Sequence, residues 1–297
     1  MDKISIIIPC YQNEENLPVT AEALKSNEGL FGDNTSFEYV LIDDGSTDKT
    51  WQSILEIKRR WPDSFSGIRL SKNTGSYNAI CAGLKRATGN CIVVMAADLQ
   101  DPPSHIFTMY DAWTKGAKLV LANRTERLDK WPSRQMATAY HFVIKTMALP
   151  NLPKGGFDFC LFDNQIKDEM IEKWISNTNS LFILLSLKHK YVLAPYKKRK
   201  RTIGQSQWTF SKKLKLFVNT VLAFSIIPPL AFYTGSLFLG TICLLVNRKV
   251  FQDQFPWSQL LILSAVLLFG LGLAIRIAYS RFQNAQKQPP FVVEESV

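Results

Sequence analysis

Short apolar runs separated by amphipathic stretches mark the first 125 residues of the 297-residue chain. The runs do not alternate between apolar and polar residues, which is typical of strands buried on both faces of a sheet. We therefore expect strands at Ile4–Ile8, Tyr39–Ile42, Ile92–Met95 and Leu119–Leu121. The repeated strand–helix units predict an α/β fold with a mostly parallel, Rossmann-like sheet.

One amphipathic stretch, Ser46–Arg60, places apolar residues at helical spacing. We expect this helix to begin at Ser46 or Thr47, because their side-chain oxygens can cap free backbone N–H groups. The middle of the chain, 124–195, is rich in Pro and Gly and predicts loops around one helix near Thr138–Ala148.

The last third of the chain changes character. Leu216–Asn247 carries no charged residue and is interrupted by Pro228 and Pro229, and a second uncharged run covers Gln254–Ile275. A bilayer crossing needs about 20 apolar residues, so the two runs predict a transmembrane hairpin. Two buried core helices are the alternative, which the apolar character on every face disfavours. The expected boundaries are a catalytic domain at 1–210, a membrane-surface helix at 211–227, a hairpin at 228–280 (spans near 229–248 and 256–277) and a tail at 281–297.

Charge is distributed unevenly along the chain, whose formal net charge is +10. Between Glu172 and Asp253 there are thirteen Lys and Arg residues and no acidic residue. Such a block favours an anionic partner, and the adjacent hairpin favours phospholipid headgroups or a phosphate-bearing substrate over nucleic acid. Basic residues flank the hairpin on both outer sides, which predicts an inner or plasma membrane protein with the catalytic domain and both termini in the cytoplasm. The stretch Ser211–Ser225 is expected to lie along the membrane surface.

The five cysteines and three histidines are scattered, and no two cysteines form a C-x-x-C pair. The sequence therefore predicts no disulfide framework and no zinc or histidine metal cluster.

The most informative stretch for chemistry is Val93–Pro103, V-V-M-A-A-D-L-Q-D-P-P. A buried strand ends here in acidic side chains, at the position where open α/β sheets bind ligands. Asp98 and Gln100 are two residues apart, so on an extended segment they point to one face. Their oxygens are suited to a hard divalent cation, with a diphosphate supplying further ligands.

Three other expected strand ends carry polar residues: I-P-C-Y-Q-N-E-E at Ile8–Glu15, V-L-I-D-D-G-S-T-D at Val40–Asp48 and K-N-T-G at Lys72–Gly75. An aromatic ring such as that of Tyr11 and a carboxylate such as that of Asp43 or Asp44 could together hold a nucleobase.

Taken in order, these motifs resemble family-2 glycosyltransferases of the GT-A fold. The segments G-G-F-D-F-C-L-F at Gly155–Phe162 and R-T-I-G-Q-S-Q-W-T-F at Arg201–Phe210, with two C-terminal spans, resemble the branch that acts on polyprenyl and dolichyl phosphates. The chain departs from that branch at Gln12, Ala96, Cys160 and Gln207, where many relatives carry Asn, Asp, Arg and Lys.

The resemblance implies roles for individual residues. The donor nucleotide sugar would be bound by Pro9, Tyr11, Asn13, Glu15, Asp43, Asp44, Asn73 and Gly75. Mg²⁺ or Mn²⁺ would be held by Asp98 and Gln100, and the acceptor and phosphates by Arg124, Arg127, Lys198, Arg201 and Ser206. The catalytic residues would be Asp98, Asp101 and Arg201, although Asp101 is equally well explained as a residue that caps or supports its loop.

The implied reaction transfers a sugar, with inversion, from a nucleotide sugar to undecaprenyl phosphate for cell-surface glycan synthesis or modification. UDP-glucose and UDP-N-acetylhexosamine are favoured over GDP-mannose as donors. The alternatives are a transferase of the same fold with another acceptor and a catalytically inactive, membrane-anchored nucleotide-binding protein. A homo-oligomer is left open.

Overall fold

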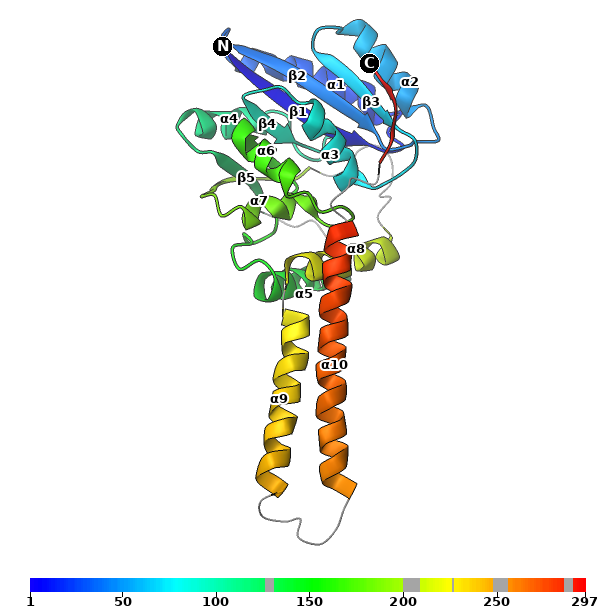
Figure 1. Ribbon diagram of the computed structural model, residues 1–297. Coiled ribbons are helices and arrows are strands. Elements are labelled where there is room, and N and C mark those ends of the chain that lie inside the picture. Colours follow the sequence, from blue (N-terminus) through cyan, green and yellow to red (C-terminus); the bar gives the residue numbers. More distant parts are fainter. Residues whose placement is uncertain (126–130, 200–208, 226, 248–255, 286–290) are drawn as a thin grey trace.

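A computed structural model describes residues 1–125, 131–199, 209–225, 227–247, 256–285 and 291–297. The chain forms an α/β head from which two long helices extend side by side (Figure 1). The N-terminus and the last described strand both lie in the head.

An eight-stranded sheet with the order β7-β5-β6-β4-β1-β2-β3-β8 forms the centre of the head. The strands are β1 (Asp2–Cys10), β2 (Thr35–Asp43), β3 (Phe65–Leu70), β4 (Cys91–Val94), β5 (Leu119–Arg124), β6 (Phe159–Asp163), β7 (Val192–Tyr196) and β8 (Val293–Ser296). Strands β1, β2, β3 and β4 run parallel to one another, as β7 does to β5, whereas β6 and β8 are antiparallel to their neighbours. The sheet is therefore mixed but mostly parallel, and the predicted α/β class is confirmed.

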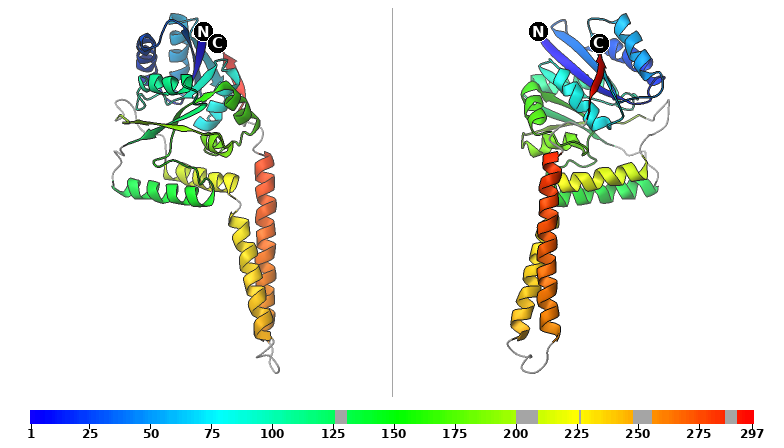
Figure 2. Two further views of the ribbon diagram at one scale, coloured as in Figure 1. Left: turned by 90° about the vertical axis from the view of Figure 1, so that its left-hand side faces the viewer. Right: turned by 45° about the vertical axis from the view of Figure 1, so that its right-hand side comes forward.

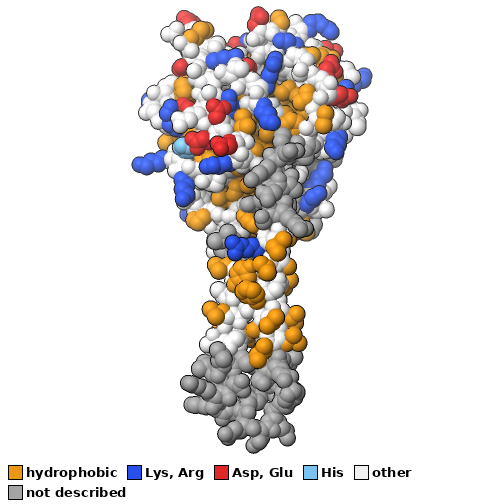
Figure 3. All heavy atoms as spheres, viewed as in Figure 1, with side chains coloured by type: hydrophobic (Ala, Val, Ile, Leu, Met, Phe, Trp, Pro, Cys, Tyr) orange, Lys and Arg blue, Asp and Glu red, His pale blue; other side chains and the backbone are white. Residues whose placement is uncertain are grey.

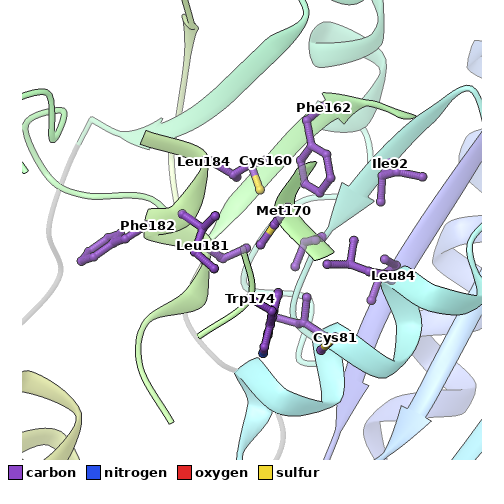
Figure 4. Packing of buried hydrophobic residues seen from close by; sticks show 14 of the residues in the cluster. Cys81, Leu84, Ile92, Cys160, Phe162, Met170, Trp174, Leu181, Phe182 and Leu184 are labelled. Atoms are coloured by element: carbon purple, nitrogen blue, oxygen red, sulfur yellow. The ribbon is translucent and has the colours of Figure 1, made fainter. Parts of the chain in front are cut away.

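Helices cover both faces of the sheet and bury two hydrophobic clusters. One face carries residues of α1 (Asn16–Asn27), α2 (Thr50–Arg60) and α4 (His105–Thr114). The other carries residues of α3 (Ser76–Arg86), α6 (Asn164–Glu172) and α7 (Ile183–Ser186). Figure 4 shows part of this second cluster, where Leu84 and Met170 lie near the strand residues Ile92 and Phe162, and Trp174 lies beside Cys81. Burial on both faces explains why the central strands are continuous apolar runs.

Two helices lie crosswise between the head and the hairpin. They are α5 (Trp131–Met147) and α8 (Phe210–Phe224), which run side by side in both views of Figure 2. The expected surface segment Ser211–Ser225 thus coincides with α8, and Thr209 caps it by accepting a hydrogen bond from the Lys212 backbone. Phe142 of α5 and Leu214 of α8 are exposed at 67% and 50%, so both crosswise helices present apolar side chains.

The hairpin consists of α9 (Ile227–Asn247) and α10 (Pro256–Ala285). By length and composition, α10 is able to cross a membrane through Ile262–Tyr279, while the described apolar part of α9, Leu230–Ile242, is shorter. Hydrophobic side chains cover much of the described surface of this hairpin in Figure 3. The helix α10 extends beyond the expected end of the second span, and part of the expected tail is β8, which pairs with β3 in the head.

The helix expected to begin at Ser46 or Thr47 begins instead at Thr50, so that prediction is wrong. The polar residues before it serve other contacts. Asp43 accepts a hydrogen bond from the Ser46 backbone N–H, and Asp48 accepts from the Thr50 backbone and hydroxyl. These side-chain contacts stabilise a turn before Thr50, so the helix begins later in the sequence than expected.

Candidate active site

The described strands bring most of the predicted residues to one edge of the sheet. The carboxyl ends of β1, β2, β4, β5 and β7 meet there with the start of the antiparallel β6. In the register of the sheet, Cys10 pairs with Asp43 and Arg124 pairs with Tyr196. Polar residues that are far apart in sequence are therefore neighbours at this edge.

Asp44 joins the end of β2 to the loop after β3. Its carboxylate accepts hydrogen bonds from the Thr74 backbone at 2.8 Å, the Thr74 hydroxyl at 2.9 Å and the Gly75 backbone at 2.8 Å. Burial raises the pKa of Asp44, and the three donors oppose that rise. In this structure Asp44 orders the loop, and a contact with the nucleotide stays a prediction.

Gly45 allows the two loops to meet backbone to backbone. It has a φ of +66°, and a Cβ atom added there would lie 2.4 Å from the Lys72 carbonyl carbon and 2.6 Å from the Asn73 nitrogen. Only glycine satisfies both the left-handed backbone and this close approach. The D-D-G and K-N-T-G motifs are thus two halves of one structure.

Asp43 lies beside Asp44 and is fully buried. One carboxylate oxygen accepts from the Ser46 backbone at 2.9 Å. The other has no hydrogen-bond partner and lies 3.8 Å from Nε of Arg69, which likewise lacks one. The positive charge of Arg69 thus faces this buried oxygen, and a contact between Asp43 and a nucleobase stays a prediction.

The turn after β1 is held by its own side chains. Asn13 accepts a hydrogen bond from the Tyr11 backbone at 2.8 Å, and its carbonyl accepts the first two N–H groups of α1. Gln12 between them has a φ of +52°. Pro9 and Tyr11 are half-buried and Glu15 is exposed, so of this group Asn13 has a clear structural role.

The acidic loop after β4 combines a half-buried and a fully buried carboxylate. Asp98 accepts a hydrogen bond from the Gln100 backbone at 3.2 Å, across Leu99 with a φ of +54°. The chain therefore turns here and is not the extended segment expected from the sequence for these two residues. Gln100 in turn accepts one from the Arg199 backbone at 2.8 Å. The loop is therefore tied directly to the basic segment after β7.

The described residues contain no group of three or more His, Cys, Asp and Glu side chains suited to a metal. A carboxylate at Asp98 and an amide at Gln100 nevertheless supply the oxygen chemistry that Mg²⁺ and Mn²⁺ prefer. They fit a cation that takes its remaining ligands from a diphosphate and water.

Asp101 has no exposed surface. One of its carboxylate oxygens accepts a 2.5 Å hydrogen bond from the Tyr196 hydroxyl and lies 3.5 Å from Nζ of Lys198. The other oxygen is buried without a partner. Burial raises the pKa of Asp101, although the Lys198 charge and the Tyr196 hydrogen bond oppose the rise.

Two cations converge on Asp158, which immediately precedes β6. Arg124 forms an ion pair with it, and Nζ of Lys198 lies 3.9 Å from the same carboxylate oxygen. Nε of Arg124 is buried without a hydrogen-bond partner. The predicted phosphate-binding residues Arg124 and Lys198 are thus brought together, and both flank the Asp98–Asp101 loop.

The remaining predicted positions are placed as follows. Asn73 and Gly75 lie in the loop that holds Asp44, whereas Arg127, Arg201 and Ser206 lie outside the described residues. Asp158 and Tyr196 also belong to the residues of this candidate site, although the sequence pattern did not predict a role for either. Asp158 stood inside the G-G-F-D-F motif, and its charge in an otherwise apolar run was the available signal.

A cavity of about 580 Å³ lies at the opposite edge of the sheet, before the starts of β5 and β7. Three of its lining residues, Lys115, Lys118 and His189, already contact Asp111, Asp163 and Glu169. It is remote from the carboxyl ends of the parallel strands, where Asp98 and Asp101 lie.

Comparison with known proteins agrees with this geometry. The sequence model of Glycosyl transferase family 2 matches residues 5–175. An uncharacterized glycosyltransferase, YkcC of Bacillus subtilis (strain 168), is 30% identical over 98% of this chain and 93% of its own length. The undecaprenyl-phosphate 4-deoxy-4-formamido-L-arabinose transferase of Enterobacter sp. (strain 638) is 25% identical over 91% of this chain and 84% of its own. The mannosyltransferase PcManGT from Pyrobaculum calidifontis, solved in complex with GDP-Man and Mn²⁺, matches in fold with a TM-score of 0.53, covering 94% of this chain and 75% of its own at 13% identity.

Proposed function

Because the chain belongs to glycosyl transferase family 2, we propose that it transfers a sugar from a nucleotide sugar to a polyprenyl phosphate at a membrane surface. The relative that carries undecaprenyl phosphate in its name aligns with 91% of this chain, which supports this acceptor. We favour UDP-glucose or UDP-N-acetylhexosamine as donor.

The observation that carries the proposal is the hydrogen bond between the Arg199 backbone and Gln100. It joins the loop suited to a cation and diphosphate to the basic segment that leads towards α8. A donor diphosphate and an acceptor phosphate that meet here would lie between the sheet edge and the crosswise helices. Two anions approach each other in such a reaction, and Arg124 and Lys198 would offset their repulsion.

The chemistry needs little proton transfer. A lipid phosphate is already an anion at neutral pH, so its oxygen can attack the anomeric carbon once it is positioned. The bond from that carbon to the nucleoside diphosphate breaks as the new bond forms, and the configuration inverts. When bound, Mg²⁺ or Mn²⁺ supplies Lewis-acid stabilisation of the departing diphosphate. Asp98 and Gln100 would hold the ion, and the buried Asp101 would support their loop.

The head and the hairpin are arranged in a way that fits a membrane-bound enzyme. The C-terminal strand β8 returns to the sheet, so the ends of the hairpin lie on the side of the head. If α9 and α10 both cross the bilayer, the catalytic domain and both ends of the chain share one side, which the basic flanks predict to be the cytoplasm.

The test is transfer by membranes that contain the full chain. UDP-glucose, UDP-N-acetylglucosamine and GDP-mannose are each supplied with undecaprenyl phosphate and Mn²⁺, and the lipid product is identified by mass. We expect one donor to yield undecaprenyl phosphate that carries a sugar, and this product should be absent when the acceptor is omitted. Product on another acceptor alone would favour a different transferase of this fold, and nucleotide binding without any product would favour an inactive protein.

A further inference from the structure

A buried amide lies between the Lys72–Gly75 loop, which is predicted to bind the donor, and the rest of the head. Asn78, in the first turn of α3, is 1% exposed. Its side-chain nitrogen donates a 2.6 Å hydrogen bond to the Thr74 carbonyl and lies 3.3 Å from the side-chain oxygen of Asn177. Its own oxygen accepts from the Asn177 backbone at 3.4 Å. Asn78 therefore connects the loop that holds Asp44 to a segment about one hundred residues later.

That segment, Ile175–Asn179, is held in turn by the crosswise helix α8. The side chain of Asn219 donates to the Asn177 carbonyl at 3.0 Å, and the Thr220 hydroxyl accepts from the Asn179 backbone at 3.2 Å. Thr220 has no exposed surface, and Asn177 has a φ of +58°. Tyr140 of α5 packs against Phe217 of α8, with 5.5 Å between the ring centroids, so the two crosswise helices contact each other beside this segment.

The contacts form a continuous path. It runs from α8 through Asn179 and Asn177 to Asn78, then to Thr74, whose backbone and hydroxyl hold Asp44. Buried hydrogen bonds of this kind fix a backbone because breaking one leaves its partner unsatisfied. The path is polar, although the neighbouring cluster on this face of the sheet is apolar.

We propose that Asn78 and the Ile175–Asn179 segment position the donor-binding loop relative to α8, so that the affinity for the donor nucleotide depends on the membrane-surface helix. This inference rests on the proposed function only for the identity of the ligand. Asn78 and Thr220 are positioning residues, since both act on the ligand through the Thr74–Gly75 loop. A helix that meets the acceptor lipid would thereby help to set the donor site.

Direct nucleotide binding tests the proposal. UDP and GDP are titrated with Mn²⁺ into the purified full chain in detergent, and the one that binds more tightly to the wild type is used for all variants. The variants are Asn78→Ala, Thr220→Val and their combination. Valine keeps the shape of threonine, so Thr220→Val removes the hydroxyl without opening a cavity and decides the question even if Asn78→Ala fails to fold.

A matched control is available in the hairpin. Thr220 and Thr241 each donate to the carbonyl four residues earlier, Leu216 and Leu237. Thr241→Val therefore removes the same bond within a helix at a place remote from the donor loop. Thr220 is buried and Thr241 is exposed, so the control isolates the effect of losing the bond within the helix, which would appear in both variants.

We expect Asn78→Ala to weaken nucleotide binding about five- to twentyfold and Thr220→Val about three- to tenfold, the effects of buried hydrogen bonds. The combination should weaken it by less than the product of the two, since both changes break one path. Thr241→Val should match the wild type. Unchanged binding in Thr220→Val, or fully multiplicative effects, would overturn the inference while leaving the proposed function intact. Failure of the wild type to bind either nucleotide would overturn both.

Discussion

The hydroxyl of Tyr196, at the end of β7, donates a 2.5 Å hydrogen bond to the fully buried carboxylate of Asp101. The two residues are 95 positions apart and belong to different sides of the candidate site. Their contact closes the acidic loop against the segment that carries Lys198. It favours a supporting role for Asp101 over direct chemistry.

We accordingly expect Asp101→Asn and Tyr196→Phe to retain measurable transfer. Tyr196→Phe removes the buried hydrogen bond, and Asp101→Asn weakens it and removes the negative charge beside Lys198. For a supporting role, the rate should fall about tenfold in each variant, the equivalent of about 1.4 kcal/mol. The measurement is turnover at saturating donor, with nucleotide binding in Mn²⁺ recorded in parallel. A loss in Asp101→Asn as complete as that in Asp98→Asn, with donor binding intact, would instead indicate a direct chemical role.

Lys198 and Lys197 form a natural pair for testing the phosphate site. Lys198 approaches Asp101 and Asp158, whereas Lys197 is exposed. Attraction to headgroups is shared by many residues at about 1 kcal/mol each, so neither Lys198→Ala nor Lys197→Ala should change membrane association much. A charged contact with the acceptor phosphate is worth about 1.5–3 kcal/mol, so Lys198→Ala should lower the rate about ten- to a hundredfold. Equal, small losses of transfer rate in both variants would remove Lys198 from the site, and the same comparison applies to Arg201.

Gly45 should tolerate no side chain. In Gly45→Ala the new Cβ would meet the backbone of Lys72, and overpacking of this kind costs about 1–3 kcal/mol. Gly116→Ala is the control, because Gly116 has a φ of +101° but nothing within 4 Å of an added Cβ. The midpoint temperature of thermal unfolding should be lower, and the affinity for UDP or GDP weaker, in Gly45→Ala than in Gly116→Ala. Equal behaviour of the two would show that the loops do not need their close approach.

Glu38, near the opposite edge of the sheet, gives the fold a pH dependence. Burial favours its neutral form, but hydrogen bonds from Ser5, Thr88 and Lys3 outweigh it and lower the pKa of Glu38 below its ordinary 4.5. A carboxyl with a lowered folded-state pKa contributes stability that is present above 4.5 and is lost as the pH falls through the folded value.

Glu38→Gln should therefore lower the free energy of unfolding by about 1–3 kcal/mol at pH 7. The deficit relative to the wild type should shrink as the pH falls below 4.5. Denaturant unfolding at pH 7 and at successively lower pH measures this difference. A deficit that stays constant with pH would contradict the assignment.

The sequence predicted the central strands well because they are buried on both faces and their side chains have no polar alternation. Ile4–Ile8 and Tyr39–Ile42 lie within β1 and β2, and only the strand ends differ. The parallel arrangement then placed the motifs at one edge, as expected. The start of α2 was predicted wrongly because Asp43 and Asp48 accept hydrogen bonds from Ser46 and Thr50. These bonds hold the segment before Thr50 as a turn, so Ser46 does not cap the helix.

Other features needed the three-dimensional arrangement. The pairing of Arg124 with Asp158 exists because β6 runs antiparallel beside β5. Nothing in the local pattern around Asn78 or Asn177 indicates that the two residues meet. The exposed strand β8 has no buried face, and its pairing with β3 therefore leaves no hydrophobic signature.

The central claim is that the loop after β4 holds the cation and donor for transfer to a lipid phosphate. The most direct measurement compares wild type with Asp98→Asn in membranes, following transfer of labelled sugar from the active nucleotide sugar to undecaprenyl phosphate at saturating Mn²⁺. We predict that the wild type forms glycosylated undecaprenyl phosphate. The transfer rate should fall at least about a hundredfold in Asp98→Asn, because a charged ligand of the cation is removed. Turnover near the wild-type rate in Asp98→Asn, or no lipid-linked product from the wild type with any nucleotide sugar, would contradict the account.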